Sequence, residues 1–139
     1  MDLTLEPVTA ANWREVAAVD AASPHVATVA YYLCLCHYGG VWQPLTIRSG
    51  NDVVGFAMWG YDADDGHHWI GGLSIDVSRQ GRGLGRAAMA ALIDRLRGLG
   101  ATSIALSYAP DNSLAARLYG SLGFLPNGEL DGEVVAVLP

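Results

Sequence analysis

Along the middle of the chain, from Trp42 onward, the hydrophobic pattern changes from helical to strand-like. Three strand-like segments follow one another at residues 45–47, 53–59 and 67–77, the second an apolar run and the others with alternating apolar and polar positions at 45–47 and 73–77. Short turns rich in glycine, asparagine and aspartate separate them at 49–52 and 62–66, so the pattern predicts three consecutive antiparallel strands. Residues 3–8 alternate in the same way and predict an outer strand at the start of the chain.

Two helices are predicted between the outer strand and these three strands. Thr9 can cap the first helix, which is expected to end near Asp20. The second is expected from Pro24 to about Tyr38, where two glycines at 39–40 close it. Its apolar side chains are not confined to one face, so it either packs on two sides or presents tyrosines and cysteines to a ligand or a second subunit. If these tyrosines and cysteines contact a second subunit, the protein is a homodimer, and this is the prediction.

Helices and strands alternate in the second half of the chain. A helix is expected from Gly85 to Gly98, with the apolar stripe Leu84, Ala88, Ala91, Leu92, Leu96 and Leu99. A strand at 103–108 then leads into a last helix at 113–122, whose expected core stripe is Leu114, Leu118 and Leu122. A short strand near Phe124, a turn at Asn127-Gly128 and a strand at 134–138 follow. Together these elements predict an α+β fold with a mixed sheet and helices on its faces.

Composition narrows the class of protein. With 139 residues, 51% of them hydrophobic, the chain is expected to form one domain over residues 1–139. A formal net charge of −6 argues against a nucleic-acid partner, because binding phosphate backbones requires clustered cations. The same charge suits a small cationic substrate.

Cysteine usage and the apolar segments predict a cytoplasmic protein without a metal site. Cys34 and Cys36 are too close for an ordinary disulfide and lack a second ligand pair for zinc, so we expect two buried, reduced thiols. The first residues are acidic and contain no signal peptide. Histidines and glycines interrupt the apolar residues 24–42, which argues against a membrane span.

The most informative stretch is residues 73–88, in which a β-branched strand runs into a glycine turn and a helix. Gly81, Gly83 and Gly85 permit a turn that points main-chain N–H groups inward at the helix N-terminus, where a pyrophosphate is attracted. Arg82 and Arg86 add positive charge. Two further glycines at 71–72 predict a bulge that opens a gap between strands for an extended ligand arm.

Other readings of the glycine turn are a purely structural strand-to-helix connection, a dinucleotide site and a phosphate loop of the Walker type. The pattern G-x-G-x-x-A from Gly83 to Ala88 fits the dinucleotide fingerprint, but no acidic residue follows at the end of the next strand to hold a ribose. The Walker pattern fails because no G-K-S or G-K-T is present.

The element Gln80-x-x-Gly83-x-Gly85 resembles the acyl-CoA-binding motif of the GCN5-related N-acetyltransferases (GNAT). Residues 111–124 resemble the second motif of that family, N-x-x-A-x-x-L-Y-x-x-x-G-F, in the expected order and about 30 residues further on. The sequences G-F-x-M-x-G-Y-D and G-F-x-P-x-G-E-x-x-G-E-V-V are most similar to the bacterial spermine/spermidine acetyltransferase group. The resemblance implies the GNAT fold, a mostly antiparallel twisted sheet of six to seven strands in the order β-α-α-β-β-β-α-β-α-β.

The resemblance also implies an activity, the transfer of an acetyl group from acetyl-CoA to a primary amine through a tetrahedral intermediate. It implies cofactor contacts from Leu73, Ser74, Ile75, Gln80, Gly81, Arg82, Gly83, Leu84, Gly85, Arg86 and Asn112. Tyr119 is implied as the general acid that protonates the departing thiolate. Helical spacing places Asn112 and Tyr119 on one face, about 10 Å apart. A non-catalytic acyl-CoA-binding domain is the alternative.

The general base and the acceptor site are less defined. Trp69 stands where many family members have a glutamate, which leaves His68, Asp76, Glu129 or a chain of waters as candidates for the base. Acidic contacts for a polyamine or an aminoglycoside are expected from Asp62, Asp64, Asp65, Glu129, Asp131 and Glu133. Aromatic walls of the acceptor pocket are expected from Tyr31, Tyr32, Trp42 and Trp59, which otherwise belong to the core.

Overall fold

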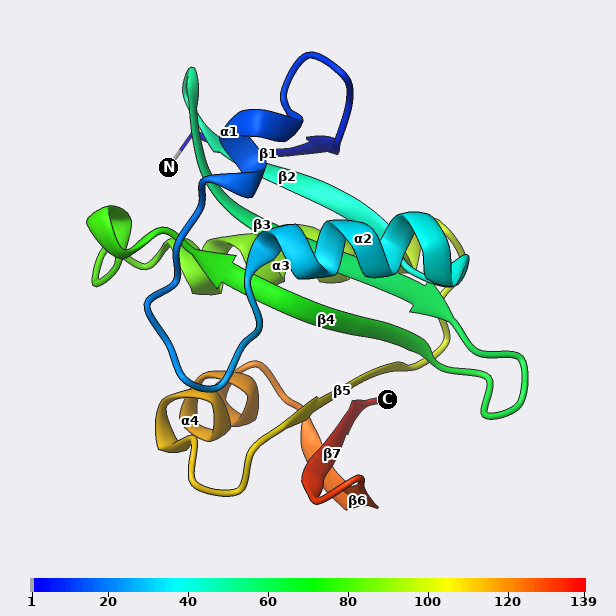
Figure 1. Ribbon diagram of the computed structural model, residues 1–139. Coiled ribbons are helices and arrows are strands. Elements are labelled where there is room, and N and C mark those ends of the chain that lie inside the picture. Colours follow the sequence, from blue (N-terminus) through cyan, green and yellow to red (C-terminus); the bar gives the residue numbers. More distant parts are fainter. Residues whose placement is uncertain (1) are drawn as a thin grey trace.

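A seven-stranded sheet organises the protein, whose computed structural model describes residues 2–139. The strands are β1 (Leu3–Pro7), β2 (Gln43–Ser49), β3 (Asp52–Tyr61), β4 (His68–Ile75), β5 (Ile104–Tyr108), β6 (Leu125–Leu130) and β7 (Glu133–Leu138). Their spatial order is β1-β2-β3-β4-β5-β7-β6 (Figure 1). All neighbouring pairs are antiparallel except β4 and β5, which are parallel. The predicted α+β fold with a mostly antiparallel sheet is confirmed.

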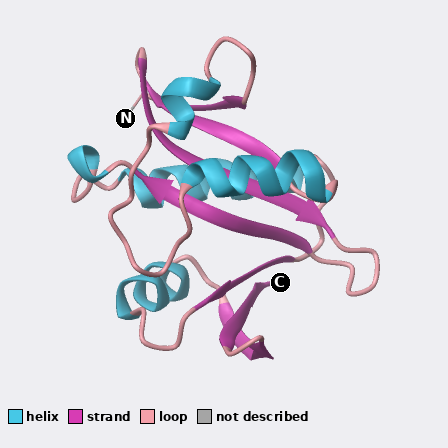
Figure 2. Cartoon of the chain, in the orientation of Figure 1, coloured by secondary structure: helices cyan, strands magenta, loops and turns pink. Residues whose placement is uncertain are grey.

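Helices cover both faces of the sheet (Figure 2). They are α1 (Trp13–Ala17), α2 (Val29–Gly39), α3 (Leu84–Gly98) and α4 (Ser113–Ser121), with a 3-10 turn η1 (Val77–Arg79) before α3. α1 and α2 lie on one face, α3 lies on the other, and α4 lies beside β5 (Figure 1). No helix within residues 2–139 is long and apolar enough to cross a lipid bilayer.

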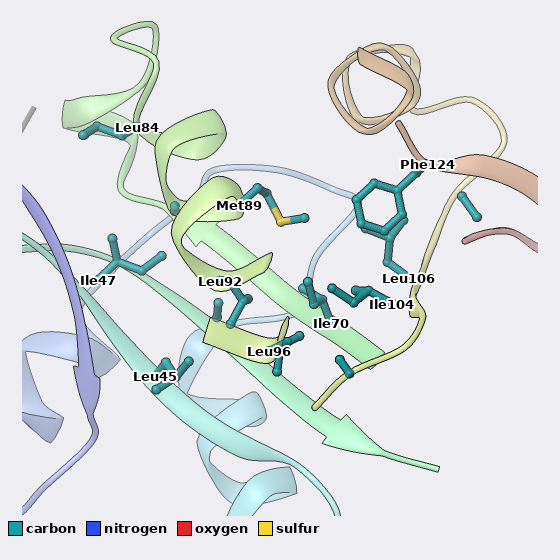
Figure 3. Close-up of a cluster of buried hydrophobic side chains, with 14 of the residues drawn as sticks. Leu45, Ile47, Ile70, Leu84, Met89, Leu92, Leu96, Ile104, Leu106 and Phe124 are labelled. Carbon is teal, nitrogen blue, oxygen red and sulfur yellow. The ribbon is translucent and has the colours of Figure 1, made fainter. Parts of the chain in front are cut away.

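The larger core lies between α3 and the sheet (Figure 3). Met89, Leu92 and Leu96 point into it from successive turns of α3, and each is at most 1% exposed. Burying one such side chain stabilises the fold by about 2 kcal/mol. Leu99 was expected in this stripe, but it lies beyond the end of the helix and is 56% exposed. Met89, which the sequence pattern missed, is fully buried.

A smaller core lies under α1 and α2 on the opposite face. The ring of Tyr32 stacks on that of Phe56, with centroids 6.0 Å apart. Cys36 is buried here as predicted, and its burial raises the pKa of the thiol to about 11. The prediction is wrong for Cys34, which is exposed because it lies on the outer face of α2.

Both N-terminal helices are shorter than predicted. α1 begins after Asn12, whose side chain turns back to accept from the N–H of Thr9 at 2.7 Å, so Thr9 does not cap a helix. α2 begins after Thr28, whose hydroxyl accepts from the N–H of Tyr31, and Pro24 lies outside it. Residues 18–28 therefore form a loop, which descends from α1 to the level of α4 before returning to α2 (Figure 1).

The end of the chain differs from the prediction in two ways. Asn127-Gly128 is not the turn but an irregularity within β6, and the chain reverses at Asp131-Gly132 instead. Both residues of that turn have positive φ, 52° and 81°, as two-residue hairpin turns require. In α4, Leu114 is 75% exposed and does not join the core as expected, whereas Leu122 packs against it.

Candidate active site

A bulge in β4 is the first local feature of the site. Phe56 of β3 faces Ser74 and Met58 faces Gly71, so two residues of β4 lie opposite one residue of β3. Gly72 adopts φ +63°, and a Cβ there would come within 3.1 Å of the Phe56 ring. The sequence-predicted bulge at 71–72 is therefore present, and only glycine fits it without strain.

At the bulge, β4 and β5 are already separate. Their parallel ladder consists of two residue pairs, His68 with Ile104 and Trp69 with Ala105. From residue 70 onward the edge of β4 that faces β5 has no ladder partner among residues 2–139. This open edge leaves main-chain N–H and C=O groups available to an extended ligand, as the sequence analysis expects.

A cavity of about 910 Å³ occupies this separation. Its walls are built from β4 (residues 69–73), the end of β5 and the following turn (106–109), α4 (Asn112, Ala115 and Tyr119) and the 18–28 loop (His25 and Val26). His25 Nδ1 lies 3.8 Å from a carboxylate oxygen of Asp111. The 18–28 loop thus reaches across to the start of α4 and forms one side of the cavity.

The glycine turn lies between β4 and α3 and has free main-chain donors. Gly81 and Gly83 both adopt φ +78°. In the described part of the chain, none of the N–H groups of residues 81–86 donates to a protein acceptor, because intrahelical bonding starts with the N–H of Ala87. Free amides at the N-terminus of a 15-residue helix form an anion-binding position.

Two arginines flank this turn. Arg82 is exposed and makes no ion pair with any described residue. Arg86 donates to the hydroxyl of Ser121 at the end of α4, so its charge is held between α3 and α4. The third glycine of the turn, Gly85, is not required by close packing, since a Cβ there would meet only Ile75 at 3.9 Å.

Gln80 and Asp76 hold the glycine turn in place. The amide nitrogen of Gln80 donates to the main-chain oxygens of Ala21 at 2.8 Å and Ile75 at 2.9 Å. A carboxylate oxygen of Asp76 accepts from the N–H of Asp20 at 2.9 Å. Hydrogen bonds from the Ser78 hydroxyl and the Asp20 N–H lower the pKa of Asp76. Both side chains therefore connect the turn to the 18–28 loop.

Tyr119 and Asn112 are brought together on one side of the cavity, as their helical spacing predicts. The Tyr119 ring packs against Tyr108 and Phe124, at centroid distances of 5.8 and 6.0 Å. The phenol of Tyr119 is protonated at neutral pH and so has a proton to donate, and burial raises its pKa from 10.0 to about 12, so it keeps that proton into more alkaline solution. The side-chain oxygen of Asn112 caps α4 by accepting from the N–H of Ala115.

Main-chain and side-chain groups of residues 73–75 serve different purposes. The side chains of Leu73 and Ile75 pack against the larger core. Ser74 is buried, and its hydroxyl donates to the carbonyl of Gly72 at 3.0 Å, which stabilises the bulge. The side chains are thus occupied inside the protein, and the main chain is what this segment offers to a ligand.

The three side chains that are candidates for the general base differ in whether they line the cavity. His68 does not line the cavity, since its ring lies with Trp59 and Tyr61, 6.1 and 4.9 Å away. Asp76 does not line it either, because its carboxylate holds the connection before the glycine turn. Glu129 does line the cavity.

The cavity lining is also acidic and aromatic. Four of the six expected carboxylates line it, namely those of Asp62, Asp65, Glu129 and Glu133, whereas Asp64 and Asp131 do not. Of the expected aromatic walls, Tyr32 and Trp42 line it, Tyr31 is exposed, and Trp59 packs against the larger core. No arginine of the described chain lines it, and the sequence contains no lysine.

Sequence reasoning missed two polar contacts in the cavity. The indole N–H of Trp69 donates to Asp65 at 2.9 Å. The hydroxyl of Ser107 donates to Glu133 at 2.8 Å. The first contact joins the 62–66 turn to β4 and the second joins β5 to β7, so neither follows from the pattern of one segment.

Comparison with known proteins gives matches in sequence and in structure. Residues 10–124 match the acetyltransferase (GNAT) family. The spermine/spermidine N(1)-acetyltransferase of Bacillus subtilis (strain 168) is 42% identical over 111 residues, which cover 73% of this chain and 71% of that protein.

Two solved structures share the fold. The ribosomal-protein-S18-alanine N-acetyltransferase from Escherichia coli has a TM-score of 0.75 at 21% identity, over 99% of this chain and 93% of that one. The PaiA N-acetyltransferase from Thermoplasma acidophilum, solved in complex with coenzyme A, has a TM-score of 0.74 at 11% identity, over 99% and 98%. The family match spans most of the chain, and the parted strands, glycine turn and buried phenol lie within it. The chain therefore belongs to the GNAT family of acetyltransferases.

Proposed function

We propose that the protein transfers the acetyl group of acetyl-CoA to a primary amine of a polyamine. One observation carries the proposal: a single cavity is lined by the open edge of β4, by the protonated phenol of Tyr119 and by four carboxylates, and by no arginine of the described chain. The open strand edge and the phenol suit a thioester with a thiol leaving group, and the carboxylates suit a substrate with several positive charges.

On the cofactor side, the main-chain groups of Leu73, Ser74 and Ile75 that β3 and Gln80 leave unpaired bind the amides of the pantetheine arm along the open edge of β4. The pyrophosphate binds to the N–H groups of residues 81–86, where the partial positive charge of the α3 N-terminus and the charge of Arg82 add to the attraction. The side-chain NH₂ group of Asn112 is free to contact the arm, because its oxygen alone caps α4. Gln80 contributes by holding the turn rather than by direct contact.

On the acceptor side, the amine attacks the thioester carbonyl directly, and a tetrahedral intermediate forms. When the intermediate collapses, Tyr119 donates its proton to the sulfur. Acidic side chains at the cavity wall hold the further ammonium groups of the acceptor. The name of the Bacillus subtilis relative, at 42% identity, supports spermine or spermidine as that acceptor.

The test is release of free thiol from acetyl-CoA with a panel of amines. We expect spermine and spermidine to give the highest kcat/KM, above aminoglycosides, free amino acids and peptides with a free N-terminus. A preference for one of the other classes would reassign the acceptor. Acetyl-CoA binding without thiol release for any amine would instead favour the non-catalytic acyl-CoA-binding domain.

A further inference from the structure

Ser107 and Glu133 form a hydrogen-bonded pair inside the cavity. The hydroxyl of Ser107 on β5 donates to the carboxylate of Glu133 on β7 at 2.8 Å, and both side chains are half-buried and line the cavity. In the β5–β7 ladder Ser107 faces Val135. Glu133 lies two residues before Val135, so all three side chains share one face of the sheet.

The pair lies where β4 and β5 separate. Trp69 and Ala105 are the last paired residues of the two strands. Two residues further along, on the same face, are Gly71 of the bulge and Ser107. The hydroxyl of Ser107 therefore lies beside the opening between the strands, in the cavity that Tyr119 lines from α4.

The other carboxylates that line the cavity have different hydrogen-bond partners. Asp65 accepts from the N–H of His67 and from the indole of Trp69, so both of its oxygens are occupied. Asp62 accepts from the N–H of Asp64 within its own turn. Glu129 is exposed and makes no polar contact with the described residues. Glu133 alone is joined to a hydroxyl, a group that can accept one proton while it donates another.

We infer that Ser107 and Glu133 form the path by which the acceptor ammonium loses its proton, an inference that rests on the proposed function. Ser107 is the group that touches the acceptor, and Glu133 acts through it. The path replaces the carboxylate that other family members place at the position of Trp69.

The proton leaves the ammonium in one concerted step with two transfers. An N–H bond of the ammonium breaks and its proton binds the Ser107 oxygen, while the original O–H proton of Ser107 passes to the Glu133 carboxylate. The amine is left neutral, with a lone pair for attack on the thioester. After attack, the nitrogen of the intermediate loses a second proton, which replaces the one that Tyr119 gives to sulfur. Glu133 returns its proton to solvent.

Other titratable groups face the same cavity and must be distinguished from this pair. They are His25, Tyr32, Tyr61, Asp62, Asp65, His67, Tyr108, Tyr119 and Glu129. His67 is the strongest competitor as a base, but its Nδ1 lies 2.7 Å from the hydroxyl of Ser103.

The test is the pH profile of kcat/KM for spermine, measured for the wild-type protein, Glu133→Gln and Ser107→Ala. We expect each variant to lose about 100-fold at pH 7, the size of a typical general-base contribution. Only spermine molecules with an already neutral amine can then react, so kcat/KM should rise about tenfold per pH unit between pH 6 and 9. The wild-type profile should be flat over that range.

Glu129→Gln is the matched control, because it removes an equal charge from the same cavity without touching Ser107. It should raise KM for spermine and keep the flat profile. The inference is overturned if Glu133→Gln and Ser107→Ala keep the wild-type profile, or if Glu129→Gln or His67→Gln shows the rising one. Circular dichroism identifies a variant that fails to fold, in which case the other variant of the pair decides. Absence of thiol release by the wild-type protein would instead contradict the proposed function.

Discussion

Tyr119 lines the cavity and packs its ring against Tyr108 and Phe124, so it is a phenol in an apolar surrounding at the edge of the candidate site. We expect Tyr119→Phe to lower kcat about 100-fold and to change KM for acetyl-CoA by less than about twofold, because the variant loses only the hydroxyl group that donates the proton. Thiol release and acetyl-CoA titration measure the two effects. Tyr108→Phe is the matched comparison, and unchanged turnover in Tyr119→Phe would remove Tyr119 from the mechanism.

The same phenol makes stability depend on alkaline pH. Burial raises the pKa of Tyr119 from 10.0 to about 12, so its unfolded form loses the proton first as pH rises. Its stabilising contribution is complete below pH 10 and is lost as pH approaches 12, by about 2 kcal/mol. Denaturant unfolding at pH 9 and pH 11 should show a smaller loss for Tyr119→Phe than for the wild-type protein. Equal losses would show that another group, such as Cys36, accounts for the slope.

Gly72 is the residue on which the bulge depends. Gly72→Ala should destabilise the fold by about 2 kcal/mol, because the backbone has φ +63° and the new Cβ meets Phe56 at 3.1 Å and Tyr32 at 3.3 Å. Gly98→Ala is the control, since its Cβ meets nothing within 4 Å and alanine favours the helix by about 0.5–1 kcal/mol. Thermal unfolding compares the two, and an unaffected Gly72→Ala would mean that the bulge relaxes without cost.

At the scale of elements, the connection between the glycine turn and the 18–28 loop determines how well the turn is preorganised. Gln80→Ala removes the hydrogen bonds to Ala21 and Ile75, so KM for acetyl-CoA should rise about tenfold with little change in kcat. Arg79→Ala removes only the exposed ion pair with Asp52 and serves as the control. A KM that rises equally in both variants would show that the effect is not specific to the two hydrogen bonds of Gln80.

The sequence predicted those elements whose signals are local. The turns at 49–52 and 62–66, the bulge at 71–72 and the pair of Asn112 and Tyr119 all follow from local spacing along the chain. The 18–28 loop was wrongly predicted as parts of two helices, because its apolar residues resemble helical ones and the competing cap at Thr28 was overlooked. The contact between Ser107 and Glu133 depends on strand pairing across 26 residues, which no local pattern contains.

At the scale of the whole molecule, the homodimer remains a prediction. The outer face of α2 carries Tyr31, Cys34 and Tyr38, with the two tyrosines 59% and 83% exposed. We expect a second copy to cover this face, so sedimentation should give about twice the chain mass of 14.7 kDa. Replacing Tyr31 and Tyr38 by serine should shift the mass to one chain. A single-chain mass for the wild-type protein would contradict the prediction.

The short ladder between β4 and β5 has a mechanical consequence. Two residue pairs connect the strands before this seam to those after it, and α3 bridges the two parts from one face only. A pantetheine arm lying in the gap would bond to β4 where the protein itself does not. The substrate would then help to hold the two parts of the sheet together. A molecule stretched across the seam should therefore resist force better with acetyl-CoA bound, and should weaken again each time coenzyme A leaves.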